Sequence, residues 1–293
     1  MSNQSFIAAC IQMNSGTDVR QNVVDATRLI REAATAGAHY VQTPEMTTIV
    51  EQNRMALEAA IHPQDGNPSI AEFSALAQEL KIWLHIGSLA IAVEGEKTGP
   101  AIANRAVLFR SDGTLAAQYD KIHMFDVDLD NGESWRESKA YRPGGKAVLT
   151  DIYPNSAPAK LGFAICYDVR FPPLFKSYAQ QGADILCAPA AFTRQTGEAH
   201  WGVLQRARAI ENGAFMISAA QVGRHEDGRE TYGHSIVVDP WGTVLAEADG
   251  QNEGYIIAKI VPDQAKDARA KIPALTNSRP YEMSFASRGD TAA

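Results

Sequence analysis

The chain has 293 residues, of which 45% are hydrophobic and 21% are charged, so it can bury a sizeable core in one large or two smaller globular domains. Its formal net charge is −7 and no run of lysines and arginines occurs, which argues against nucleic acid and anionic membranes as partners. The sequence lacks the apolar runs of a secretory signal or a membrane span. We therefore expect a soluble, cytoplasmic protein.

Three cysteines occur, at positions 10, 166 and 187. They are too few for a disulfide framework, and their spacing does not match a CxxC zinc site. The sequence also lacks the GxxxxGK[ST], GxGxxG and HExxH patterns, so nucleotide-driven and zinc chemistry are disfavoured. A cysteine with a special role would be special for its reactivity.

Short apolar runs alternate with amphipathic segments along the chain, which predicts an α/β architecture. Several of the runs are apolar at successive positions, as expected of strands covered on both faces. The predicted strands are Phe6–Met13, Ile82–Ala90, Asn104–Phe109, Lys160–Cys166, Asp184–Pro189, Ala214–Gln221 and Ser235–Asp239.

Helices are predicted between these strands. The first places Val23 and Ile30 on one face and takes Thr17 or Asp18 as its cap, and the second follows Pro68. A third follows prolines 172 and 173, and a fourth covers about residues 198–211. A tight turn is predicted at residues 240–242. No linker divides the chain, so we predict a single domain over residues 1–293, with a core at about 5–262 and a less regular tail at 263–293.

The least structured internal segment is Met124–Gly145, which is rich in acidic, basic and aromatic residues. Loops of this length are uncommon in compact domains and are usually functional. A solvated surface excursion is the alternative interpretation.

Cys166 ends an apolar run and is followed by a polar turn and two prolines that begin a helix. In open α/β sheets, ligands bind beyond the carboxyl ends of the strands, and a helix N-terminus stabilises a thiolate. The position is therefore suitable for a nucleophile. Cys10 and Cys187, by contrast, lie inside apolar runs that are typical of ordinary core strands.

A thiol with an ordinary pKa near ~8.5 needs a base to become an effective nucleophile. His200 and His234 follow Cys166 in the order of a papain-like enzyme, but one begins an amphipathic helix and the other opens a strand. A shielded carboxylate can serve instead, and Glu45 directly follows a short apolar strand. Lys121 also ends a strand, from which its ammonium could balance an oxyanion.

The segments Thr-Pro-Glu around Glu45, Tyr-Asp-Lys-Ile-His around Lys121 and Cys-Tyr-Asp-Val-Arg-Phe-Pro around Cys166 resemble the three signature blocks of the nitrilase superfamily, in the family's order. The resemblance extends from Phe6 to about Pro273. It implies a four-layer αββα sandwich that pairs with a second subunit, as a homodimer or a higher homo-oligomer, and uses neither a metal nor an organic cofactor.

The same resemblance implies the roles of the site residues. Glu45 would be the general base, Lys121 would stabilise charge, and Cys166 would attack a small-molecule amide to form a thioester. Glu137 matches an additional glutamate of the family, which helps to position the substrate and Lys121. The backbone N–H of Tyr167 would share the oxyanion with Lys121.

Within the superfamily, residues 191–211 are most similar to amidases that act on deaminated glutathione, and next to ω-amidases that act on 2-oxoglutaramate. Arg170, Thr193 and Thr196 could bind a carboxylate of such substrates, although Arg170 could equally make an internal salt bridge. An N-carbamoyl amide hydrolase, an acyltransferase and a non-catalytic binding protein remain alternatives. A true nitrilase is disfavoured because Tyr-Asp, and not Trp-Glu, follows Cys166.

Overall fold

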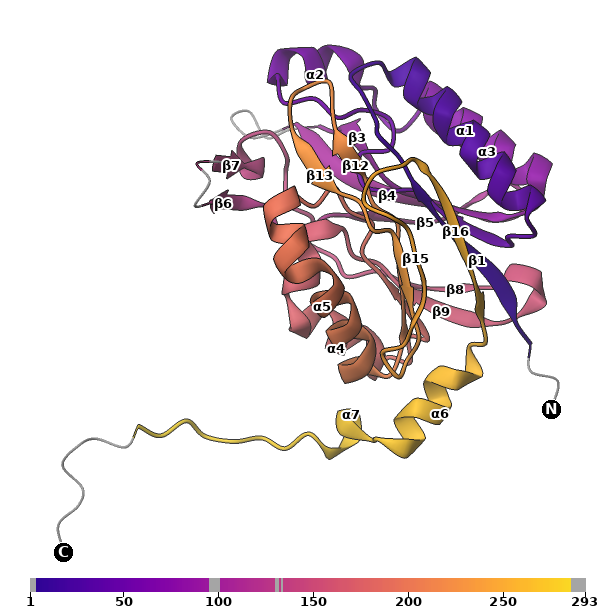
Figure 1. The fold of residues 1–293 in the computed structure, drawn as a ribbon, viewed down its shortest axis with the longest axis vertical. Helices are drawn as coiled ribbons and strands as arrows, with labels where there is room; N and C mark the ends of the chain where they lie inside the picture. The colour runs from indigo at the N-terminus through magenta and orange to yellow at the C-terminus, as the bar shows by residue number, and fades with distance from the viewer. Residues whose placement is uncertain (1–3, 95–100, 130–131, 133, 286–293) are drawn as a thin grey trace, which may run out of the picture.

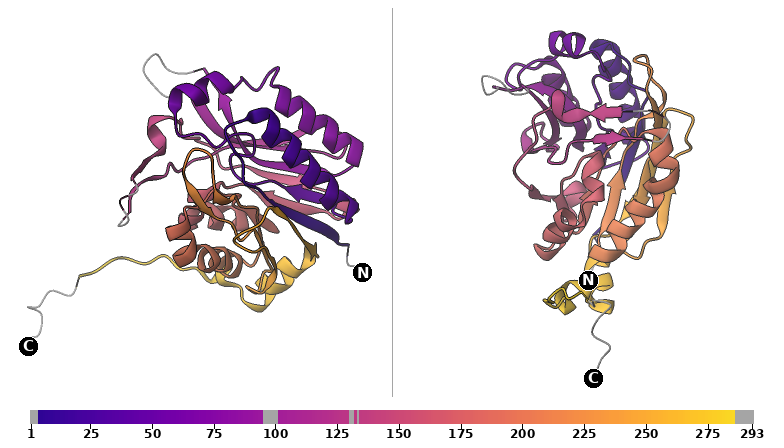
Figure 2. Two further views of the ribbon diagram at one scale, coloured as in Figure 1. Left: turned by 45° about the horizontal axis from the view of Figure 1, so that its top comes forward. Right: turned by 90° about the vertical axis from the view of Figure 1, so that its left-hand side faces the viewer.

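The computed structural model describes residues 4–94, 101–129, 132 and 134–285. Two six-stranded sheets lie between two pairs of helices, which gives the four-layer αββα sandwich that the sequence predicted. In Figures 1 and 2, helices α1 (Val19–Thr35) and α3 (Pro68–Leu80) lie on one side, and α4 (Pro172–Gln180) and α5 (Arg194–Asn212) lie on the other.

The first sheet combines the N-terminal half of the chain with one late strand. Its order is β16-β1-β2-β3-β4-β5, in which β1, β2 and β3 are parallel and the remaining pairs are antiparallel. The strands are β1 (Phe6–Gln12), β2 (Tyr40–Gln42), β3 (Trp83–Ala92), β4 (Ile102–Phe109), β5 (Leu115–Asp120) and β16 (Gly254–Ile260).

The second sheet is formed by the C-terminal half in the order β15-β14-β11-β10-β9-β8, with a parallel centre of β9, β10 and β11. Its strands are β8 (Leu149–Ile152), β9 (Ala159–Gly162), β10 (Ile185–Cys187), β11 (Phe215–Ser218), β14 (Ile236–Val238) and β15 (Val244–Glu247). The predicted turn at 240–242 joins β14 to β15, which pair antiparallel.

Buried apolar side chains, among them Ile30 as the sequence pattern predicted, hold the layers together. Leu29 and Ile30 of α1 pack with Phe73 and Leu76 of α3 over the first sheet. A larger cluster, which includes Phe163 and the buried Trp201, fills the space between the two sheets and beneath α5. Burial of large side chains at this density is the main force that stabilises the sandwich.

Local signals set the ends of the helices. Asp18 is the N-cap of α1, because its side chain accepts hydrogen bonds from the backbone N–H groups of Arg20 and Gln21. Asn67 caps α3 in the same way, and Pro68 occupies its first turn. Of the two caps expected for the first helix, the structure therefore uses Asp18.

Several strand ends differ from the predicted ones by one to three residues, and four predictions differ further. The strand expected at Lys160–Cys166 ends at Gly162, and Cys166 begins a 3-10 turn, η3 (Cys166–Arg170). Helix α5 begins earlier than residue 198, at Arg194. Outside the two six-stranded sheets and the four helices that cover them, the chain also forms short elements. Among these are α2 (Arg54–Ala60), η2 (Pro154–Ser156) and the hairpin of β12 (Val222–Arg224) with β13 (Glu230–Tyr232).

The other two differences concern segments expected to be irregular. Residues 124–145 contain a short hairpin, β6 (Asp126–Asp128) with β7 (Ser134–Arg136), and a 3-10 turn, η1 (Glu137–Lys139). The tail begins with α6 (Asp263–Lys271) and α7 (Ala274–Asn277). Helix α6 is held in place because Ala265 is buried and Arg269 donates hydrogen bonds to backbone carbonyls of the sandwich. No helix in the described part of the chain is long and apolar enough to cross a membrane.

Candidate active site

Glu45, Lys121 and Cys166 meet at one edge of the sandwich, although they are far apart in the sequence. Glu45 follows β2 and Lys121 follows β5 of the first sheet, whereas Cys166 follows β9 of the second. Their exposed fractions are 4%, 2% and 8%. The two sheets therefore bring an acid, a base and a thiol together in a site that is largely shielded from water.

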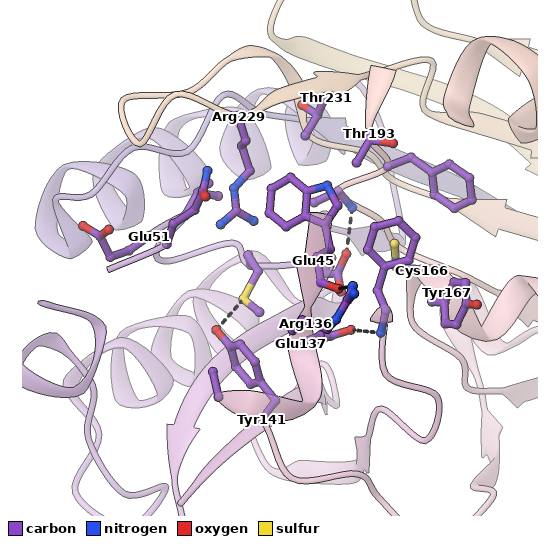
Figure 3. A pocket seen from close by; sticks show the side chains of 18 of the residues that line it. Glu45, Glu51, Arg136, Glu137, Tyr141, Cys166, Tyr167, Thr193, Arg229 and Thr231 are labelled. Carbon is purple, nitrogen blue, oxygen red and sulfur yellow. Dashed lines mark hydrogen bonds between the residues drawn. The ribbon is translucent and has the colours of Figure 1, made fainter. Parts of the chain in front are cut away.

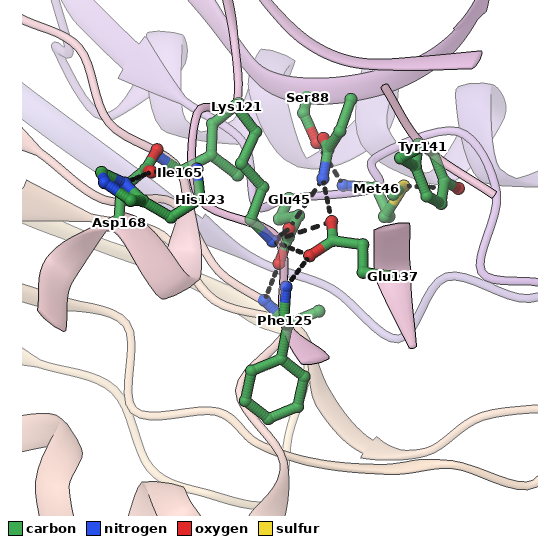
Figure 4. Close-up of polar contacts among 12 residues, drawn as sticks. Glu45, Met46, Ser88, Lys121, His123, Phe125, Glu137, Tyr141, Ile165 and Asp168 are labelled. Carbon is green, nitrogen blue, oxygen red and sulfur yellow. Dashed lines mark hydrogen bonds and ion pairs between the residues drawn. The ribbon is translucent and has the colours of Figure 1, made fainter. Parts of the chain in front are cut away.

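Lys121 forms the centre of a charged cluster, which Figure 4 shows between two carboxylates. Its Nζ lies 2.9 Å from Oε1 of Glu45 and 2.9 Å from each carboxylate oxygen of Glu137. Glu137, at the start of η1, also accepts a 2.7 Å hydrogen bond from the backbone N–H of Phe125. The long segment after Met124 thus supplies a carboxylate that fixes the ammonium.

Two further groups hold the Glu45 carboxylate in place. The Nδ2 of Asn104 donates to Oε1 of Glu45 at 2.9 Å and to Glu137 at 3.2 Å. The backbone N–H of Ala191 donates to Oε2 of Glu45 at 2.8 Å. Sequence reasoning missed Asn104, although a fully buried amide in the apolar strand β4 is itself a signal of a required polar contact.

Cys166 sits at a sharp turn. Its φ of +47° lies in the left-handed region, and its backbone N–H donates to the carbonyl of Pro189 at 2.9 Å. The buried Asp168 carboxylate fastens the turn by accepting hydrogen bonds from the N–H of Ile165 at 2.9 Å and the hydroxyl of Tyr119 at 2.6 Å. Such conformations persist only where surrounding contacts hold them, and they are common at active sites.

The electrostatics of the cluster follow from burial and from mutual attraction. Burial raises the pKa of the Cys166 thiol, and the adjacent Glu45 carboxylate raises it further. For Glu45, the effect of burial is outweighed by the charge of Lys121 and by hydrogen bonds, so its pKa is lowered. For Lys121, burial is outweighed by the charges of Glu137 and Glu45, so its pKa is raised.

At neutral pH the resting site therefore holds a thiol beside an ionised Glu45 and a protonated Lys121. This differs from the thiolate that a nearby helix N-terminus was expected to favour. Because the base lies against the thiol, the proton can leave Sγ as the nucleophile attacks.

A cavity of about 270 Å³ opens onto these residues (Figure 3). Tyr167, Thr193 and Thr196, which the sequence predicted to bind substrate, all line it. The two threonine hydroxyls lie 2.8 Å from each other. Thr193 is the N-cap residue of α5 and Thr196 lies in its first turn.

Arg170 is placed differently. It is not among the lining residues, and its Nη1 lies 3.2 Å from Nδ1 of His200. Its guanidinium stacks 5.2 Å from the centre of the Phe192 ring, which itself lines the cavity. Among the described residues no carboxylate forms an ion pair with Arg170. The alternative prediction, an internal salt bridge of Arg170, is therefore wrong for this part of the chain.

The two histidines considered as bases, His200 and His234, have other partners than the thiol. His200 contacts Arg170, and His234 pairs with Glu247 at 3.1 Å. Neither lines the cavity. Among the residues that the structure describes, no group of three or more His, Cys, Asp or Glu could hold a metal ion.

Two residues that sequence reasoning missed line the far part of the cavity, Trp135 of β7 and Arg229 beside β13. The Arg229 guanidinium stacks 5.2 Å from the Trp135 ring centre. A Trp and an Arg in polar hairpins carry no periodic signal, so only the folded chain shows that they meet.

Comparison with known proteins agrees with this geometry. The profile of the carbon-nitrogen hydrolase family matches residues 7–270. The deaminated glutathione amidase of Synechocystis is 38% identical over 92% of this chain and 97% of its own length. The omega-amidase NIT2 of Pongo abelii is 36% identical over 94% of this chain and 95% of its own.

A solved structure supports the same assignment. Saccharomyces cerevisiae Nit3, a member of branch 10 of the nitrilase superfamily, superposes with a TM-score of 0.80 at 29% identity, covering 92% of this chain and 95% of that one. The matched profile spans both sheets and every residue of the charged cluster. This chain therefore belongs to the carbon-nitrogen hydrolase family.

Proposed function

We propose that this protein is a cysteine-dependent amidase that hydrolyses deaminated glutathione through a thioester intermediate. The observation that carries the chemistry is the convergence of Cys166, Glu45 and Lys121 at one buried point of a cavity. The substrate is supported by the similarity, over nearly the whole chain, to proteins named deaminated glutathione amidase.

In the first half of the reaction, Glu45 takes the proton from the thiol as Sγ of Cys166 adds to the amide carbon. Negative charge then develops on the amide oxygen. The Lys121 ammonium balances that charge, and the N–H of Tyr167, in the first turn of η3 where helical donors lack internal acceptors, is placed to donate to it.

The tetrahedral adduct collapses when Glu45 returns its proton to the amide nitrogen and the C–N bond breaks. The amine leaves and the acyl group stays on sulfur as a thioester. Glu45 is then a carboxylate again and deprotonates a water molecule that hydrolyses the thioester, which restores the thiol. Glu137 and Asn104 keep Lys121 and Glu45 in position throughout.

Substrate carboxylates would be bound by donors beside the thiol. Thr193 and Thr196 offer hydroxyls to the cavity. Arg170 would reach it only after exchanging its contact with His200, which its partly exposed side chain permits.

An ω-amidase that acts on 2-oxoglutaramate is the second candidate, because NIT2 is nearly as similar. Both substrates carry the same 2-oxoglutaryl group and differ in the amine, which is cysteinylglycine in one and ammonia in the other. Release of 2-oxoglutarate can therefore be measured for both in parallel.

We expect the kcat/KM of the wild type for deaminated glutathione to be at least about ten-fold higher than that for 2-oxoglutaramate. Cys166→Ala should lose activity by at least about 10³-fold, whereas Cys187→Ala, which changes a buried cysteine of a core strand, should keep it. A preference for 2-oxoglutaramate would favour the ω-amidase, and turnover of neither would contradict the proposal.

We further propose that the protein is a homodimer in the cytoplasm. Exposed apolar side chains along α5 and the β14–β15 turn, namely Val203, Ile210 and Trp241, support a covered face. Three unpaired cysteines support a reducing compartment. A monomeric mass in light scattering at micromolar concentration would contradict the dimer.

A further inference from the structure

The basic side chains that line the cavity differ in how fully they are engaged. Arg54 donates from Nε to Glu58 and from Nη1 to a backbone carbonyl. Arg136 uses both terminal nitrogens, on Asp128 and on two backbone carbonyls. The catalytic lysine is held by two glutamates. Only the fourth cation, Arg229, keeps both terminal nitrogens without an acceptor in the described part of the protein.

Arg229 is nevertheless firmly oriented. Its Nε donates to Oδ2 of Asp227 at 2.8 Å, and its backbone N–H donates to Oδ1 of the same carboxylate at 3.1 Å. The Asp227 side chain is 2% exposed and that of Arg229 is 18% exposed. Because Asp227 binds Nε, the Nη1 and Nη2 atoms stay available to a ligand. Figure 3 shows the guanidinium pointing into the cavity, across from Cys166.

The turn that carries Arg229 is fixed from behind. His225, buried at 3% exposure, has its Nδ1 2.8 Å from the carbonyl of Ser15 and its Nε2 2.7 Å from the hydroxyl of Thr231. The Trp135 ring packs against the guanidinium face. A cation on such a turn has little conformational freedom left to lose when a ligand binds.

Arg229 also lies where the catalytic cavity meets a second cavity of about 680 Å³. Both cavities are lined by Arg229 and by its neighbours Gln52, Ser134, Trp135 and Glu230. The two candidate leaving groups differ in length. Ammonia stays beside the reacting carbon, whereas a dipeptide amine, which spans about 7 Å when extended, can extend from that carbon toward this junction.

We propose that Arg229 binds the C-terminal carboxylate of a peptidyl leaving group and so selects amides of carboxylate-bearing peptides over primary amides. The two Nη donors match the two oxygens of a carboxylate, and such paired contacts are strong and directional. Asp227 is a positioning residue that fixes the guanidinium. The inference rests on the proposed function, because it assigns the site of the glycine carboxylate of deaminated glutathione.

The test compares deaminated glutathione with its glycinamide analogue, which differs only in the terminal charge. Wild type should prefer the acid in kcat/KM by about 10- to 100-fold, as expected for hydrogen bonds to a charged group. In Arg229→Gln the ratio of the two substrates should fall to about one. Arg229→Lys keeps an ion pair with Asp227 but loses the paired donors, so its ratio should lie between the two.

The matched control is Arg28→Gln, which removes an exposed, ion-paired arginine of α1 and should keep the wild-type ratio. A variant of Arg229 that stays folded and retains the preference for the acid would overturn the inference. If wild type does not hydrolyse deaminated glutathione, the proposed function fails, and the same two ligands are then compared by calorimetric binding to Cys166→Ala. Equal affinity for both there, or no binding of either, would overturn the role of Arg229 independently.

Discussion

The two ends of the cavity are built from different kinds of structure. At the chemical end, Glu45, Lys121 and Cys166 lie in the segments that come after strands of the two six-stranded sheets, and all three are almost fully buried. At the outer end, the lining includes residues of two small hairpins, β6–β7 and β12–β13, which lie outside the two six-stranded sheets, and residues at the start of α2. On the proposed function, the reaction chemistry is tied to the core of the sandwich, whereas substrate recognition is carried by peripheral segments that can change without disturbing that core.

The comparison predicts that changes at the chemical end reduce kcat most. Glu45→Gln keeps the shape of the side chain but cannot accept the thiol proton, so kcat should fall by about 10²- to 10⁴-fold. Glu32→Gln, which removes an exposed carboxylate of α1 away from the cavity, is the control. If kcat falls by less than about ten-fold, another group is the base.

Asn104→Ala should have an intermediate effect. It removes the amide that donates to both Glu45 and Glu137, and the lost orientation should reduce kcat by about 10- to 100-fold. Because that donor also stabilises the ionised Glu45, the acidic limb of the pH profile should move toward neutral pH in this variant. An unchanged limb with reduced activity would indicate a structural role only.

At the outer end, Trp135→Leu should act on KM and leave kcat nearly unchanged. The indole packs against the Arg229 guanidinium and lines both cavities, so its loss should raise KM for deaminated glutathione by about 3- to 10-fold. If kcat falls as strongly as kcat/KM in this variant, Trp135 acts on the chemical step as well as on substrate binding, which would contradict the separation of the two ends of the cavity.

A change of pH near neutrality should have the smallest effect on kcat/KM. Glu45 must be ionised to act, and its lowered pKa means that activity is lost only as pH falls below the usual range of a glutamate. The raised pKa of Lys121 keeps the ammonium in place as pH rises. A kcat/KM profile should therefore be flat between about pH 6 and 8, and an acidic limb inside that window would contradict the assignment of the base.

The difference between the two ends of the cavity also decides how much of the site could be predicted from the sequence. Glu45 and Cys166 follow apolar runs that end in polar motifs, so periodicity predicted their place near the ends of strands. The αββα layering was implied by the resemblance to the nitrilase superfamily. Thr193 and Thr196 line the same cavity as Glu45, Lys121 and Cys166, and their binding of substrate stays a prediction.

The outer end escaped prediction for a physical reason. Arg229 and Trp135 meet only because two hairpins, distant in sequence and without an apolar period, pack together. The segment 124–145 was expected to be a loop because its turns are short and polar, whereas pairing of β6 with β7 depends on register that composition does not encode. The contact of Ala191 with Glu45 comes from a backbone N–H, which no side-chain pattern reports.

The central claim is that Cys166 carries the acyl group, and the most direct measurement is to trap it. Glu45→Gln and wild type are mixed with deaminated glutathione, quenched in acid, digested and analysed by mass spectrometry. We predict a 2-oxoglutaryl adduct on the peptide that contains Cys166, absent from Cys166→Ala. An adduct on Cys10 or Cys187, or product formation without any acylated cysteine, would contradict the account.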